Sequence, residues 1–117
     1  MRLALPILGF ILALASVVAC KSSGEATGST CPTSSTLTYE NFGKTFMTTY
    51  CTDCHSSNGK SEPPILDNIT SIRSAISAID KSAASGPDSS NDEMPEGRDV
   101  AEGERKKLGE WLACGAP

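Results

Sequence analysis

Five residues, Cys51-Thr52-Asp53-Cys54-His55, constrain this chain more than any other part of its sequence. Their C-x-x-C-H spacing is the haem attachment signature: two thiols three positions apart form thioethers with the haem vinyl groups, and the adjacent histidine is then placed under the iron. His55 is also the only histidine in the chain. Because a covalently bound haem is a large apolar disc, a chain that carries one must fold around it. The segment therefore predicts one haem c, with His55 as an iron ligand.

Other uses of the cysteine pair remain as alternatives. C-x-x-C also occurs in zinc sites and in thiol redox enzymes, and Cys51 and Cys54 could form a simple disulfide with His55 exposed. The sequence offers no second pair of metal ligands for zinc. A thiol–disulfide enzyme would predict a strand–helix fold without haem, and a simple disulfide would leave the helices no large apolar body to enclose.

The first 19 residues have the layout of a secretory signal, with Arg2 followed by an apolar run from Leu3 to Ala15 and small residues up to Cys20. Val17-Val18-Ala19-Cys20 resembles the lipobox of bacterial lipoproteins, which implies that Cys20 is lipidated and becomes the mature N-terminus. A retained signal anchor is the alternative, because about 17 apolar residues can just span a bilayer. Either reading predicts export to the periplasmic side of a bacterial membrane. Lys21 favours the outer membrane, since aspartate there would resemble an inner-membrane retention signal.

The chain that remains is acidic and short of core side chains. Loss of the signal removes Arg2 and no acidic residue, so nine basic and 14 acidic residues leave a net charge of −5. This sign argues against nucleic acid as a partner and favours redox proteins with a positive docking face. Much of the 38% hydrophobic content lies in the signal, so a single small domain that gains core from its haem is expected, and we expect it to be a monomer.

Hydrophobic periodicity predicts an all-α domain from Leu37 to Pro117, preceded by a flexible Ser/Thr/Gly-rich tether over residues 20–36. No segment alternates with period two, so no sheet is expected. Three helices are predicted: Tyr39 to about Tyr50 with Thr38 as cap, Asn68 to Ala84 with an isoleucine stripe, and a last helix that ends near Cys114 and opens with Asp99 and Glu102 as a capping box.

From Leu37 to Cys114 the chain resembles the class I c-type cytochromes. That resemblance implies a cytochrome c-like fold with three main helices around one haem, in which the first and last helices cross at small residues, here Gly43 and Gly109. It also implies a proline loop, Pro63-Pro64-Ile65-Leu66, whose proline carbonyl accepts the ring proton of the ligand histidine. Pro64 is the candidate and Pro63 the alternative. Ile65 and Leu66 would pack on the haem, with a plain core role as the alternative for both. The function implied is transfer of single electrons between redox partners, with no catalysed reaction.

Met94-Pro95 resembles the distal methionine segment of the same family, which implies that Met94 is the sixth iron ligand. Met47 lies one helical turn before Cys51, on the side tied to the haem edge, so it is a poor rival. The alternative is a five-coordinate iron with Met94 exposed, and the function would then be that of a haem-based gas sensor or ligand-binding protein.

Two cysteines remain after Cys20 is assigned to lipid and Cys51 and Cys54 to haem. Cys31 and Cys114 are expected to pair in an oxidising compartment, closing a loop of about 84 residues. Two free thiols are the alternative.

Overall fold

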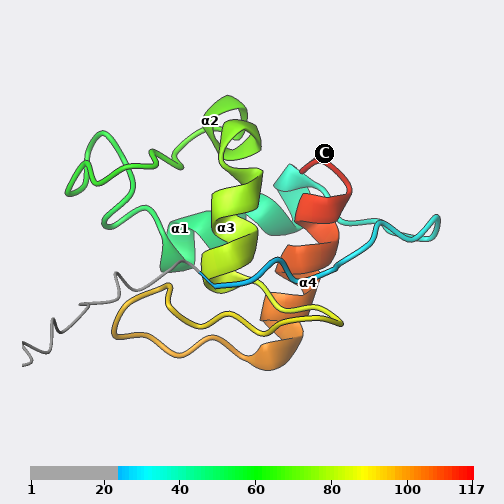
Figure 1. Cartoon of the computed structure of the whole chain (residues 1–117). Helices are drawn as coiled ribbons and strands as arrows, with labels where there is room; N and C mark the ends of the chain where they lie inside the picture. The colour runs from blue at the N-terminus through cyan, green and yellow to red at the C-terminus, as the bar shows by residue number, and fades with distance from the viewer. Residues whose placement is uncertain (1–23) are drawn as a thin grey trace, which may run out of the picture.

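A computed structural model describes residues 24–117, and that part of the chain is helical. A π-helical turn, η1 (Tyr39–Gly43), runs into α1 (Lys44–Tyr50), and three helices follow: α2 (Ile69–Ser74), α3 (Ile76–Ala83) and α4 (Glu102–Ala113) (Figure 1). The described residues contain no strand beyond an isolated bridge between Ser85 and Ser90. This confirms the all-α prediction. No helix within residues 24–117 is long and apolar enough to cross a bilayer, and the predicted signal with Cys20 lies outside the described residues.

The first helical segment begins where the sequence predicts. The Thr38 hydroxyl accepts a hydrogen bond from the Asn41 backbone N–H at 3.1 Å, and the Asn41 side chain accepts one from the Thr38 N–H at 2.7 Å. This reciprocal pair satisfies two backbone donors that a helix start leaves free. Phe42 and Phe46 are buried on the face that the periodicity predicts.

The predicted middle helix is divided at Ala75. The Ala75 N–H donates to the carbonyl of Ile72, three residues back, at 2.9 Å, and its backbone leaves the α-helical region. The Ser74 hydroxyl donates to the Thr70 carbonyl, four residues back. Such a side-chain bond competes with the backbone hydrogen bonds of the same helical turn and often bends a helix. The isoleucine stripe survives the break, since Ile72 and Ile79 are both buried.

The last helix begins at Glu102, so the predicted capping box between Asp99 and Glu102 is wrong. Ala101 is the N-cap and makes no side-chain hydrogen bond. The Glu102 carboxylate instead accepts hydrogen bonds from the hydroxyls of Ser85 at 3.2 Å and Ser90 at 3.0 Å. It therefore ties the helix start to the preceding loop.

The core forms where the first helical segment meets α4. Gly43 faces the Trp111 ring so closely that a methyl group there would overlap it, and Phe42 meets the same ring edge-on at 6.0 Å between centroids. Gly109 does not take part in this crossing, because it lies against Ser29 and the Ser85 carbonyl. The expectation for Gly43 is therefore confirmed and that for Gly109 is wrong.

The segment before the domain is irregular, but part of it is attached to the helices, which corrects the expectation of a free tether. Thr27 is fully buried and bonds to the Asp80 carboxylate through both its N–H (2.9 Å) and its hydroxyl (2.6 Å). The blue segment in Figure 1 accordingly crosses the end of α3 and passes beside α4, where Ser29 lies against Gly109. Cys31 and Cys114 form a disulfide with their Cα atoms 4.7 Å apart, as predicted.

Candidate functional site

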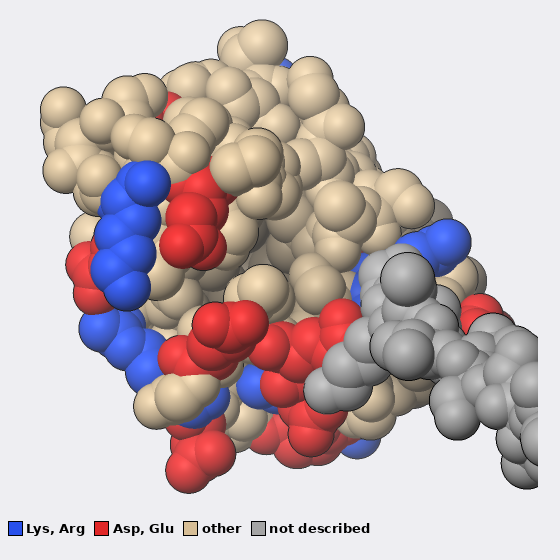
Figure 2. Space-filling view, turned by 60° about the vertical axis from the view of Figure 1, so that its left-hand side comes forward, with Lys and Arg blue, Asp and Glu red and all other residues tan. Residues whose placement is uncertain are grey.

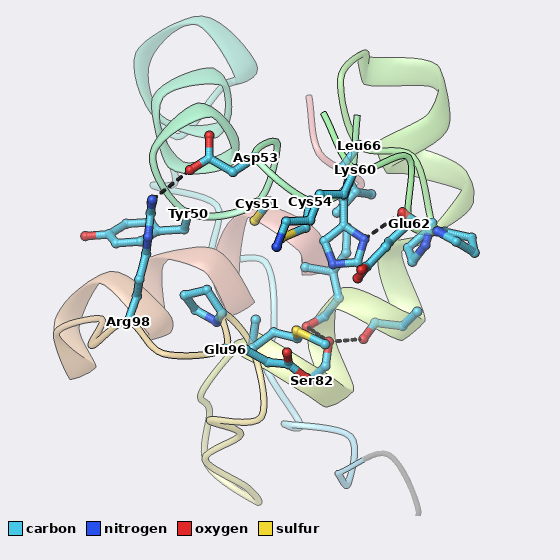
Figure 3. Close-up of a pocket in the computed structure, with 18 residues that line it drawn as sticks. Tyr50, Cys51, Asp53, Cys54, Lys60, Glu62, Leu66, Ser82, Glu96 and Arg98 are labelled. Atoms are coloured by element: carbon cyan, nitrogen blue, oxygen red, sulfur yellow. Dashed lines mark hydrogen bonds and ion pairs between the residues drawn. The ribbon is translucent and has the colours of Figure 1, made fainter. Parts of the chain in front are cut away.

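A cavity of about 400 Å³ opens between the C-x-x-C-H segment, α3, the proline loop and the loop between α3 and α4 that carries Met94. That volume lies in the range of ligand pockets, about 300–1,000 Å³. Figure 2 shows it as a hollow with acidic side chains on its rim, and Figure 3 shows its walls. The lining is largely apolar and comes from four parts of the chain: Tyr50, Cys51, Asp53, Cys54 and His55; Lys60, Glu62, Pro63, Pro64 and Leu66; Ala78, Ile79, Ser82 and Ala83; and Met94, Pro95, Glu96 and Arg98.

The end of α1 places the two thiols at the cavity wall. Cys51 caps the helix by donating to the Met47 carbonyl, and the backbone N–H groups of Cys54 and His55 both donate to the Cys51 carbonyl, at 3.2 and 2.9 Å. This tight turn directs both cysteines and His55 to one side of the cavity. Burial disfavours the thiolate and raises the pKa of the Cys51 thiol to about 12, so this thiol is protonated at neutral pH. The two cysteines are not bonded to each other.

The imidazole of His55 is held by the carbonyl of Glu62, with Nδ1 2.9 Å from the oxygen. The prediction that a proline carbonyl, from Pro64 or Pro63, accepts this proton is therefore wrong. The reason is that the Glu62 N–H donates to the Cys54 carbonyl at 2.9 Å, which folds the loop back two residues before Pro64 and one before Pro63. With Nδ1 as the donor, Nε2 keeps its lone pair for a metal. Pro63 and Pro64 still line the cavity.

Leu66 lies at the base of the same loop, and its packing on a haem stays a prediction. It is 5% exposed, lines the cavity and donates its N–H to the His55 carbonyl at 2.6 Å. Ile65 is not part of the lining. Asp67 closes the loop by accepting from the Ser57 backbone N–H at 3.0 Å, and this bond lowers the pKa of the Asp67 carboxyl, with further help from the Asn68 side chain.

Met94 lines the cavity from a different part of the chain, the loop between α3 and α4. Its side chain is half-buried, and its N–H donates to the Ser82 carbonyl at the end of α3, at 2.9 Å. Met47 is 2% exposed within the helical core and takes no part in the lining. Of these two methionines, Met94 is thus the one that shares the cavity with His55.

Arg98 is a site residue for which the sequence gives no signal. Its guanidinium pairs with the Asp53 carboxylate at 2.7 Å and also donates to the Thr49 carbonyl (Figure 3). This ion pair connects the loop between α3 and α4, called here the methionine loop, to the C-x-x-C-H segment 45 residues earlier. Tyr50 and Ile79, in contrast, lie on helix faces that the periodicity predicts to be apolar.

Acidic side chains gather beside the methionine. Asp92, Glu93, Glu96 and Asp99 lie together with Met94 around an open surface hollow, and Arg98 is the one basic residue among its lining. The rim of the site is therefore negative on the side of Met94, in agreement with the acidic composition.

The residues present fit a haem better than a bare metal ion. Within residues 24–117 no group of three or more His, Cys, Asp or Glu side chains is arranged to hold a metal. A porphyrin supplies four ligands of its own and needs from the protein an apolar slot and one or two axial groups. The cavity offers these features, with two thiols along its edge.

Comparisons with protein families, with curated proteins and with solved structures found no match for this chain.

Proposed function

We propose that this chain is a mono-haem c-type cytochrome that carries single electrons. The observation that supports this most is the meeting of Cys51, Cys54 and His55 with Met94 around one apolar cavity, although Met94 comes from a loop some 40 residues later. A haem bound there supplies an iron that alternates between ferric and ferrous. The chain itself binds, orients and shields it.

The thiols are suited to thioether formation. Each S–H would add across one vinyl group, forming a carbon–sulfur and a carbon–hydrogen bond with no leaving group and no oxidant. This requires both cysteines to be reduced, as they are here, while Cys31 and Cys114 are bridged to each other.

The residues that would hold the iron are His55 and Met94, which line the same cavity. The Glu62 carbonyl fixes the His55 ring and makes Nε2 more basic. A thioether ligand such as Met94 favours the ferrous state and raises the reduction potential. The negative rim favours brief encounters with redox proteins that present a positive face.

We further propose that the protein is exported and held at a bacterial membrane, with the outer membrane favoured, through lipid on Cys20. The support is the arrangement of the first 20 residues and the disulfide, which needs an oxidising compartment to persist. One such domain, acting as a monomer, is sufficient for the role.

The second candidate function is a gas sensor with an open sixth site. Carbon monoxide binding to the reduced holoprotein decides between the two, with Met94→Ala as the open-site reference. An electron carrier shows slow or no binding in the wild type and rapid binding in Met94→Ala. Equal, rapid binding in both proteins would refute Met94 ligation and favour the sensor.

A further inference from the structure

We propose that Arg105 is a positioning residue that holds Met94 at the cavity. The inference rests on the proposed function, because it takes Met94 as an iron ligand. Arg105 belongs to α4 and is 6% exposed, which is unusual for a side chain that is always charged.

One nitrogen of Arg105 joins three separate points of the chain. Nη1 donates to the carbonyls of Ala83 at 2.7 Å, Asn91 at 3.0 Å and Met94 at 2.8 Å. Since Nη1 carries two hydrogens, one is shared between two of these oxygens. The guanidinium thus connects the end of α3 to the beginning and the end of the segment that leads to Met94.

Arg105 also completes the fixing of the Met94 peptide. The Met94 N–H donates to Ser82 of α3, so its carbonyl is the group that remains to be held, and Arg105 holds it. Arg105 is the one side chain hydrogen-bonded to Met94 among the described residues. Its own carbonyl accepts from the Ser85 N–H at 3.1 Å, which fixes the start of the same loop.

The charge of Arg105 is not paired with an acid. Both salt bridges formed within residues 24–117 involve other cations, Arg98 and Lys107. Burial of an unpaired charge is costly unless hydrogen bonds satisfy it, and here three carbonyl dipoles do so. A positive charge one peptide from the proposed sulfur ligand also disfavours the ferric state, which carries one more positive charge than the ferrous state.

The test compares holoproteins with intact covalent haem: wild type, Arg105→Ala, Arg105→Lys and the control Lys106→Ala. Lys106 is the exposed neighbour on the same helix. Three readouts report on the methionine: the charge-transfer band of methionine-ligated ferric haem, the reduction potential, and the rate of carbon monoxide binding after reduction.

We expect Arg105→Ala to weaken or lose the band, to lower the potential and to bind carbon monoxide roughly tenfold faster or more, a change typical of losing buried hydrogen bonds. Arg105→Lys should be intermediate, because an ammonium keeps the charge but cannot span three carbonyls. Lys106→Ala should match the wild type. If Arg105→Ala does not accumulate, the same three readouts compared between Arg105→Lys and the wild type test the inference.

Arg105 variants that melt earlier but keep the band, potential and binding rate of the wild type would show a merely structural role and overturn the inference alone. A wild type that itself lacks the band would refute Met94 ligation, and the inference with it.

Discussion

His55 illustrates how a single residue carries two requirements of the site. One ring nitrogen bonds to the Glu62 carbonyl, and the other is left for a metal. Met94 has a similar division of labour, because its peptide groups bond to α3 and α4 while its side chain lines the cavity. In both cases hydrogen bonds fix one part of the residue and leave another part, Nε2 of His55 or the thioether of Met94, without a hydrogen-bond partner among the described residues.

Replacing Met94 by alanine should leave covalent haem in place and lower the reduction potential, by a part of the roughly 0.8 V range that axial ligands span. The reason is loss of the soft thioether that favours ferrous iron. Potentiometry of the holoprotein measures this. The matched control is Met47→Leu, a volume-conserving change in the core that should leave the potential unaltered. Equal potentials for wild type and Met94→Ala would contradict the assignment.

Asp67 should make the loop next to His55 sensitive to acid. The Ser57 N–H stabilises its carboxylate and holds the pKa of the Asp67 carboxyl in the folded protein below its ordinary value. Asp67 therefore adds stability above the unfolded pKa, and this is lost as pH falls through the folded pKa. Asp67→Ala should melt earlier than wild type at pH 7, and the difference in melting temperature should close as the pH falls through the lowered pKa of the folded state. Asp92→Ala, which alters another exposed carboxylate, is the control, and a gap independent of pH would argue against this role.

At the scale of elements, the first helical segment and α4 depend on one close approach. Gly43 has no side chain, so the Trp111 ring can rest against the helix backbone, and Phe42 completes the contact. These helices carry the C-x-x-C-H segment at one end and Arg105 near the start of α4. Their packing therefore determines how the walls of the cavity face each other.

Gly43→Ala should destabilise the fold by about 1–3 kcal/mol, because the added methyl group overlaps Trp111. The control is Gly103→Ala in α4, where a methyl group meets nothing within 4 Å. Alanine there should be neutral or stabilising by up to about 1 kcal/mol, since glycine is the poorer helix former. Denaturant unfolding followed by tryptophan fluorescence gives both values, and equal stabilities for the two variants would contradict the packing account.

The helices could be predicted because their signals are local. The first helix is predicted by the capping residue Thr38 and by the spacing of its aromatic residues, and both signals lie within one short segment. The predicted capping box at Asp99 is wrong because Glu102 accepts hydrogen bonds from Ser85 and Ser90, 17 and 12 residues earlier in the preceding loop. The sequence also could not predict the contacts of Arg98 with Asp53 and of Arg105 with Met94, because only the tertiary fold brings these residues together. The same holds for the Glu62 carbonyl, whose place depends on how the proline loop turns.

Within residues 24–117, the segment before the first helix is joined to distant parts of the chain by a disulfide and by hydrogen bonds. Cys31 is bonded to Cys114 after α4, and Thr27 is bonded to Asp80 of α3. Asn91 adds a bond to the Glu25 carbonyl at 2.7 Å, so the N-terminal segment also touches the methionine loop. The sequence predicted the disulfide by counting cysteines, whereas the attachment of Thr27 had no signal in a Ser/Thr-rich segment.

Loss of the disulfide should be costly because its loop spans most of the domain, with 83 residues of sequence separation. On the chain-entropy view, the double variant Cys31→Ser with Cys114→Ser should be less stable by up to about 4–5 kcal/mol. Its visible spectrum should not change, since neither cysteine lines the cavity. Urea unfolding and the spectrum check the two parts, and a bleached spectrum in the folded variant would contradict this separation of roles.

Intact mass of the protein produced with a cytochrome c maturation system shows whether a haem is joined to Cys51 and Cys54. We expect a coloured protein whose mass is that of the chain plus one haem, retained after denaturation in acid and lost in the Cys51→Ala, Cys54→Ala double variant. A colourless wild-type protein with the mass of the polypeptide alone would contradict it.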